Sequence, residues 1–258
     1  MRAAGKRILL PLGLLLTLGL LLSSGLSSES PIQLDWGLLS LMIIAVLLGL
    51  LYWDFERSAI SSREVALMAV LAAIAAVARV PFALLPSIQP TTFIVIISGF
   101  VLGPRAGFMI GAAAALASNF FLGQGPWTPW QMMGWGLAGL LAGWGKLFFP
   151  RAFLKGLPIF CFGWGYIFGW LMNLWSWLAF IYPLNWQSFL VACAASFWFD
   201  TLHALGNAAF YLLFGPTFIK ILNRYGRRLK VEEIVPAAAG GAVNCSFEAG
   251  KGRSIKKQ

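Results

Sequence analysis

The chain has 258 residues, of which 59% are hydrophobic and only 11% are charged, and its formal net charge is +10. A soluble domain usually carries roughly 25% charged residues, so the composition excludes a purely water-solvated protein and indicates an all-α integral membrane protein. The single histidine, His203, excludes a multi-histidine metal site, and three cysteines (Cys161, Cys193, Cys245) lack metal-ligand spacing. We therefore expect no metal site and no cofactor.

Eight apolar segments follow one another along the chain, most of them near the ~18–20 residues that cross a bilayer. The fourth is short and contains Gly99 and Gly103, so we expect it to be tilted or broken. No strand-like alternation accompanies the segments. They cover residues 8–28, 36–53, 64–80, 92–103, 106–122, 131–149, 158–181 and 188–214.

These segments predict three parts of the chain: a two-span leader at 1–60, a six-span domain at 61–230 and a disordered basic tail at 231–258. The first segment also has the basic start, apolar centre and small-residue end of a signal peptide. A retained span and a cleaved signal both remain open. Residues 29–35 lie outside in either case, so the later topology is the same.

The positive charges lie in every second gap between the apolar segments. All of the 19 Lys and Arg residues except Arg79 fall on one side of the predicted topology. The positive-inside rule then places both termini in the cytoplasm, with eight spans. The net charge is thus a topology signal, and we expect a membrane lipid environment and no nucleic-acid partner.

Three connections on the predicted outer side, at 79–92, 123–131 (GQGPWTPWQ) and 182–188, each contain proline and glutamine. Proline reduces the entropy lost on binding, and glutamine both donates and accepts hydrogen bonds. The nearby tryptophans predict either an interfacial aromatic belt or a site for a sizeable, partly planar, mostly neutral ligand. The candidate contacts are Gln89, Asn119, Gln124, Trp127, Trp130, Gln131, Trp175 and Trp186.

Arg79 is the lone outward cation, and two interpretations of it stay open. It either snorkels at a helix end or contacts a phosphate or carboxylate of a ligand.

The last apolar segment carries Asp200, His203 and Asn207, whose spacing puts them on one helix face. An ionisable group at that depth marks a partner or a function. The open alternatives are a hydrogen-bonded network that braces the bundle, contact with a ligand, and proton-coupled transport or catalysis. The chain lacks GxSxG, HExxH and GxxxxGK[ST] motifs, which argues against an enzyme.

Small residues form two stripes that allow close helix approach in lipid. For Gly107, Gly111 and Ala115 we expect packing within the chain. The alanine stripe of the third segment fits internal packing or a docking surface for another membrane subunit equally well. It consists of Ala66, Ala69, Ala73 and Ala76.

Residues 63–225 resemble the substrate-binding S component of energy-coupling factor (ECF) vitamin transporters. The resemblance rests on REVALMAVLAAIAAVARVPF at 63–82, on the stretch from Gln89 to Gly143, and on the polar last span. The stretch from Gln89 to Gly143 is its most specific part. The GPWTPWQM motif looks most like S components associated with cobalamin or related corrinoids.

The resemblance implies a six-helix S-component bundle in the plasma membrane of a prokaryote, which is not itself an enzyme. It implies capture of a vitamin at the outer face, with loop 79–92 as a lid and Asp200 and His203 among the candidate contacts. Docking on a T subunit with two ATPase subunits would use Ala69, Ala73 and Ala76. The alternatives are another ring-containing vitamin such as riboflavin, a membrane enzyme that uses Asp200 and His203, and a purely structural membrane partner.

Overall fold

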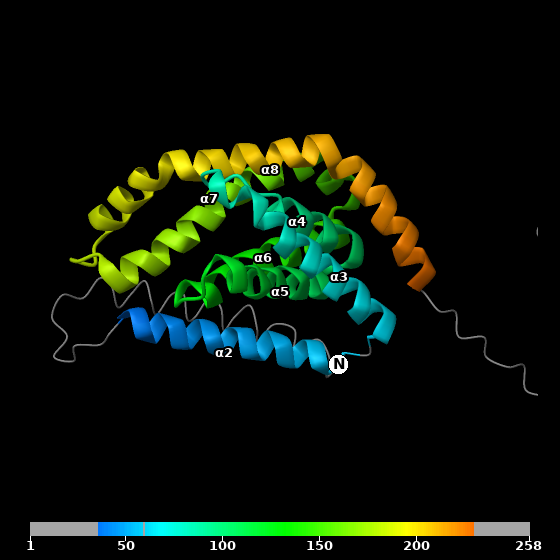
Figure 1. Cartoon of the computed structure of the whole chain (residues 1–258), viewed down its shortest axis with the longest axis horizontal. Helices are drawn as coiled ribbons and strands as arrows, with labels where there is room; N and C mark the ends of the chain where they lie inside the picture. Colours follow the sequence, from blue (N-terminus) through cyan, green and yellow to red (C-terminus); the bar gives the residue numbers. More distant parts are fainter. Residues whose placement is uncertain (1–35, 59, 230–258) are drawn as a thin grey trace, which may run out of the picture.

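The computed structural model describes residues 36–58 and 60–229, so the predicted first span at 8–28 and the tail at 231–258 lie outside the described residues. Within the described ranges every regular element is helical, which confirms the all-α prediction (Figure 1). The elements are α2 (Trp36–Glu56), α3 (Ser62–Arg79), the 3-10 helix η1 (Pro81–Leu84), α4 (Thr91–Leu102), α5 (Pro104–Leu122), α6 (Trp127–Phe148), α7 (Pro150–Phe180) and α8 (Trp186–Leu229).

Five of the described helices are long and apolar enough to cross a membrane, by length and composition: α2, α3 together with η1, α5, α7 and α8. The predicted short fourth segment is the 12-residue helix α4, and Gly103, with a φ of 103°, separates it from α5. A φ in this region is strained for residues with a Cβ, so glycine allows the chain to reverse between the two helices.

The connection between α5 and α6 is shorter than the sequence predicts. We expected a loop over 123–131, but α6 begins at Trp127, so only residues 123–126 connect the two helices. Pro126 precedes the helix and Pro129 lies in its first turn. Proline fits there because the first N–H groups of a helix have no partner within the helix. The prolines that suggested a loop therefore start a helix.

The last two helices are longer than predicted. α7 begins at Pro150 rather than at 158, and α8 continues to Leu229 rather than ending at 214. Each contains an internal proline, Pro158 and Pro216. Proline removes one backbone hydrogen bond and can bend a helix without ending it, so the predicted start at 158 and the predicted end at 214 were both wrong.

Glycines bring α4, α5 and α6 into backbone contact. A Cβ added at Gly99 or Gly107 would overlap the backbone of Gly139, and one added at Gly111 would overlap the backbone of Trp135. Ala115 is fully buried on the same helix. The prediction of packing within the chain for this stripe is confirmed, and these three helices form a tightly packed centre.

The second predicted span, α2, packs against α6 and α7. Its buried residues Ile44, Leu47 and Leu48 belong to one hydrophobic cluster with Trp130 of α6 and Trp177 of α7. This part of the predicted leader is therefore attached to the bundle along its length (Figure 1).

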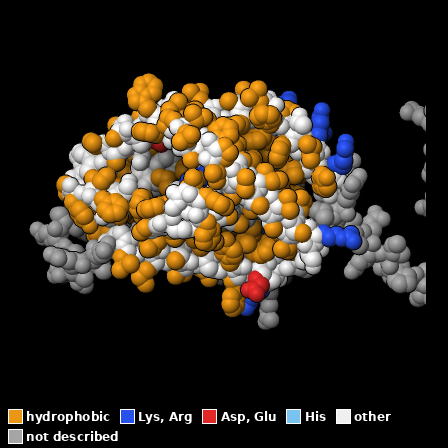
Figure 2. Space-filling model, in the orientation of Figure 1, with side chains coloured by type: hydrophobic (Ala, Val, Ile, Leu, Met, Phe, Trp, Pro, Cys, Tyr) orange, Lys and Arg blue, Asp and Glu red, His pale blue; other side chains and the backbone are white. Residues whose placement is uncertain are grey.

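The described cations gather at one end of the bundle. Arg105 Nε, at the start of α5, lies 3.2 Å from Asp54 Oδ2 at the end of α2, which places these two helix termini together. Figure 2 shows Lys and Arg side chains mainly at the end where α8 finishes, and hydrophobic side chains over most of the remaining face. Arg79, at the opposite end of α3 from Arg63, is the exception among the described residues.

Candidate ligand site

Arg79 turns into the bundle at the end of α3. Its Nε donates to Gln89 Oε1 at 2.8 Å, and its Nη1 donates to Ser118 Oγ and to Asn119 Oδ1 at 2.8 Å each. The guanidinium carbon lies 4.7 Å from the ring centroid of Trp135, a cation–π geometry. A snorkelling arginine extends to water, so the structure does not support that interpretation of Arg79.

The polar contacts continue from α5 to the start of α6. Asn119 Nδ2 donates to Thr128 Oγ1 at 2.9 Å and to Gln131 Oε1 at 2.8 Å. Thr128 in turn donates to Gln124 Oε1 at 2.9 Å. We call the whole group the Arg79 cluster: Arg79, Gln89, Ser118, Asn119, Gln124, Thr128, Gln131 and Trp135.

The cluster mixes buried and open members. Asn119 is 1% exposed, whereas Gln89 and Gln131 are half-buried and Gln124 is exposed. Apart from the guanidinium, its polar groups are neutral amides and hydroxyls. The arrangement can therefore offer one positive charge and several neutral donors and acceptors to a ligand.

Loop 80–90 lies between the cluster and α8. Phe82 makes an edge-to-face contact with Phe210 at 5.4 Å between ring centroids, and Ile88 lies against Gly206. Gln89, the residue that Arg79 holds, ends this loop. The loop is thus anchored on one side by apolar contacts to α8 and on the other by the Arg79–Gln89 hydrogen bond.

The tryptophans predicted as ligand contacts lie in different environments. Trp127 and Trp175 are half-buried and meet edge to face, with ring centroids 6.0 Å apart. Trp130 is 1% exposed and packs with Met133 in the hydrophobic cluster shared with α2. The expectation that Trp130 contacts the ligand is corrected, because the helix begins earlier than predicted and this side chain is buried in the bundle.

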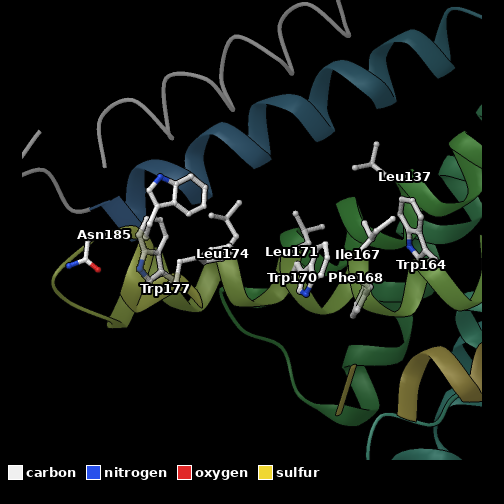
Figure 3. A pocket seen from close by; sticks show the side chains of 11 residues that line it. Leu137, Trp164, Ile167, Phe168, Trp170, Leu171, Leu174, Trp177 and Asn185 are labelled. Carbon is white, nitrogen blue, oxygen red and sulfur yellow. The ribbon is translucent and has the colours of Figure 1, made fainter. Parts of the chain in front are cut away.

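Trp186 is likewise apart from the Arg79 cluster. It is 53% exposed and lines an apolar groove of about 270 Å³ along α7, together with Trp170 and Phe189 (Figure 3). The groove lining is hydrophobic except for Asn185, so it does not share the hydrogen-bonding chemistry of the cluster.

Asp200, His203 and Asn207, for which a bracing network was one of the open alternatives, do not bond to one another. Asp200 Oδ2 accepts from Ser196 Oγ at 2.8 Å and its carboxylate lies against Gly169 of α7, whereas His203 Nε2 lies 2.8 Å from Thr92 Oγ1 of α4. Three helical residues correspond to about 300°, so the two side chains diverge enough to meet different neighbours. The structure therefore does not support the alternative of one network that joins all three side chains.

His203 and Asn207 on α8 are both relevant to a ligand site. Thr92 Oγ1 also accepts from Trp135 Nε1 at 2.9 Å, so His203 is linked to the Arg79 cluster through Thr92 and Trp135. Asn207 is fully buried, and within the described part of the chain neither its Oδ1 nor its Nδ2 has a hydrogen-bond partner.

The alanine stripe of α3 is divided between surface and interior. Ala69 and Ala73 are exposed, beside the exposed Val70 and Val77. Ala76 is 2% exposed, so it belongs to the internal packing side and not to the outward face that we expected it to share.

The structure thus brings five predicted residues together: Arg79, Gln89, Asn119, Gln124 and Gln131. Sequence reasoning left Ser118, Thr128 and Trp135 out of the candidate contacts. Ser118 precedes Asn119, and Thr128 lies inside the GPWTPWQ motif, so proximity could have suggested both. Trp135 belongs to the tryptophans near the outer side, but nothing in the sequence shows that Arg79 reaches it from another helix.

The fold and this site define a class: a polytopic α-helical membrane protein with a largely neutral polar site, bordered by a loop, at the end opposite its cations. Comparison with known proteins agrees. The family model described as "ECF transporter, substrate-specific component" matches residues 63–225, more than half of the chain. The chain belongs to this family. No curated protein and no solved structure matches the chain significantly.

Membership gives the general role. The protein is the substrate-specific component of an ECF transporter, a transport subunit and not an enzyme, and it partners with ECF T and ATPase subunits. The matched residues begin within α3 and end within α8, so α2 lies before the part that defines the family.

Proposed function

We propose that this S component captures a vitamin at the Arg79 cluster, and that the vitamin is cobalamin or a corrinoid precursor. The observation that carries the proposal is the environment of Arg79. Among the described residues its side-chain hydrogen bonds go to the neutral Gln89, Ser118 and Asn119, and the ion pair found there is the distant Arg105–Asp54 pair. A partly buried cation with neutral partners is suited to the phosphate or carboxylate of a ligand.

The rest of the cluster supports a large, otherwise neutral ligand. Corrinoids carry amide side chains around the ring, and four amide side chains of the cluster (Gln89, Asn119, Gln124, Gln131) both donate and accept hydrogen bonds. Cobalamin also carries a single phosphate diester, which matches the single arginine. Release of Gln89 from Arg79 would free loop 80–90 on one side and admit the ligand.

Riboflavin or another ring-containing vitamin is the second candidate. The Trp127–Trp175 pair favours it, since an edge-to-face indole pair presents an aromatic surface to any planar ring. Flavins and corrinoids absorb at different wavelengths, so the spectrum of the purified protein separates the two candidates.

The test begins with the protein purified by gentle extraction, whose bound small molecules are identified by mass spectrometry. A titration with cobalamin, followed by tryptophan fluorescence, then measures affinity. Saturable binding supports the proposal. If no binding is seen and a different vitamin co-purifies, cobalamin is excluded as the substrate while the role as an S component stands.

We propose further that the exposed part of the α3 stripe, Ala69 and Ala73, docks on the T subunit. Small residues let another helix approach closely in lipid. Ala73→Leu should reduce the amount of T subunit that co-purifies and leave vitamin affinity unchanged. Ala209→Leu, at an exposed position of α8, is the matched control and should reduce neither.

Capture of a vitamin from outside requires one orientation of the protein in the plasma membrane of a prokaryote. In that orientation the Arg79 cluster faces outward, and both termini lie in the cytoplasm if segment 8–28 is retained. Single cysteines at the exposed positions Gln124 and Arg151 test it. A membrane-impermeant maleimide added to cells should label position 124 and spare position 151. The reverse pattern would exclude capture from the outside.

A further inference from the structure

We propose that the apolar segment 8–28 is retained and packs into the groove along α7, as a second layer beside α2. The groove measures about 270 Å³ and its wall comes from α6, α7 and the start of α8 (Figure 3). The lining residues on which the proposal rests are Leu137, Ile167, Trp170, Leu174, Trp186 and Phe189.

The groove is apolar and open. Ile167, Trp170 and Trp186 are 46%, 52% and 53% exposed, and none of the described residues that line the groove is charged. Such a surface within the spanning part of the bundle can be covered by lipid or by another apolar helix.

The groove lies beside α2. Its lining residues Leu137 and Leu174 pack against the same hydrophobic cluster as Leu47 and Leu48 of α2. Figure 3 shows α2 running alongside α7, with Leu174 on the side that faces α2.

The start of α2 also lies at the right end of the groove. Trp36, the first residue of α2, packs against that same cluster together with Leu184 of the α7–α8 turn and Phe189 at the start of α8. The turn residue Asn185 lines the groove. The residues that precede Trp36 therefore join α2 next to the outer end of the groove.

The length of the connection limits where segment 8–28 can go. Residues 29–35 span at most about 24 Å when fully extended, so the segment must enter the membrane close to Trp36. Its 21 residues would extend about 31 Å as a helix, enough to cross a bilayer. It would run antiparallel to α2 and parallel to α7.

The composition of segment 8–28 favours the segment over free lipid as the occupant of the groove. ILLPLGLLLTLGLLLSSGLSS contains no charge, and its glycines at 13, 19 and 25 leave room for the protruding aromatic side chains of the groove. A short tether keeps the segment at a high effective concentration beside the groove. Packed there, the leader leaves the exposed face of α3 with Ala69 and Ala73 free for a partner.

Disulfide cross-linking in membranes tests the inference. In the full chain with its three cysteines replaced by alanine, one cysteine is placed at Ile167, and a second is placed in turn at each position from Leu14 to Leu20. Both helices run from the inner to the outer side, so these positions lie at similar depth. Val70→Cys, exposed on α3, is the matched control, and Trp170→Cys repeats the scan from a second groove position.

We expect intramolecular cross-links from Ile167→Cys at positions three or four residues apart, and none from Val70→Cys, because a disulfide requires Cβ atoms about 3.5–4.5 Å apart. Intact mass should show residues 8–28 present. Three results would overturn the inference: loss of the segment in the mature protein, no cross-link from either groove position, which leaves lipid as the occupant, or cross-links only between two copies of the chain. None of these results depends on which vitamin is bound.

Discussion

The glycine-packed centre and the Arg79 cluster are held together by different kinds of contact. In the centre, the backbones of α4, α5 and α6 meet directly at Gly99, Gly107 and Gly139, so no side chain can move aside. In the cluster, side chains from α3, α5 and α6 meet through hydrogen bonds of 2.8 to 2.9 Å.

The glycine-packed centre is rigid, whereas the contacts of the Arg79 cluster can be exchanged for contacts to a ligand. Backbone contacts have one arrangement, and any added atom forces the helices apart. Hydrogen bonds between amides and an arginine can be replaced by equivalent bonds to a ligand. The protein thus places an exchangeable site at the end of a rigid frame, and four substitutions test the contrast.

The largest effect is expected from Gly139→Ala. Its Cβ would overlap the backbone of Gly107, so the helices must separate, with a loss of stability at or above the upper end of the ~1–3 kcal/mol range for overpacking. Thermal unfolding in detergent measures it. Gly163→Ala, where a Cβ meets nothing within 4 Å, is the control. Equal melting temperatures for the two variants would contradict the rigid-centre interpretation.

Arg79→Gln should weaken cobalamin binding by about 2 kcal/mol, roughly 30-fold, because a hydrogen bond to a charged group is lost. Titration by tryptophan fluorescence measures this. The variant should bind cobinamide, which lacks the phosphate diester, about as well as the unaltered protein does. If affinity for both ligands falls equally, Arg79 organises the cluster and does not recognise phosphate.

A smaller loss of affinity is expected from Trp127→Ala, about 1–2 kcal/mol, since it removes one face of the Trp127–Trp175 pair. Trp198→Ala is the control, because Trp198 is 72% exposed and contacts Phe197. The same titration compares them. Unchanged affinity in Trp127→Ala would leave this indole only a role in the interfacial belt.

The smallest effect, and one of opposite sign, is expected from Asn207→Leu. Replacing a buried amide that lacks partners by an apolar group of similar size should stabilise the unliganded protein by about 1 kcal/mol. Asn173→Leu is the control and should destabilise it, because Asn173 Nδ2 donates to Ser196 at 2.7 Å. Destabilisation by Asn207→Leu, read from thermal unfolding, would mean that its amide is satisfied in the folded protein.

Much of the fold could be predicted from hydropathy, and the errors have a common origin. The start of α5 was predicted within two residues, and α4 was shifted by only one residue at each end. The start of α6 at Trp127 and the continuation of α8 past Pro216 were missed, because the predicted segments stop beside these prolines. Proline at the start of a helix, or in a helix packed along its length, does not end the helix.

The candidate site was predicted only in part. Glutamines and Asn119 near the outer loops could be named because polar groups are rare in such a chain. Trp130 was assigned to a loop that is helical in the structure, and Ala76 to the same outward face as Ala69 and Ala73. Spacing shows which residues share a helix face, but which part of that face is covered depends on the neighbouring helices.

The sequence by itself determined that this chain is a helical membrane protein, where its helices lie and at which end its cations gather. Hydropathy and charge are properties of each segment, so they can be evaluated without knowledge of neighbouring helices. Only the tertiary structure decided that Arg79 meets Gln89, Asn119 and Trp135, and that Asp200 and His203 have separate partners. These contacts depend on the rotation and crossing of whole helices, which the packing of backbone on backbone establishes.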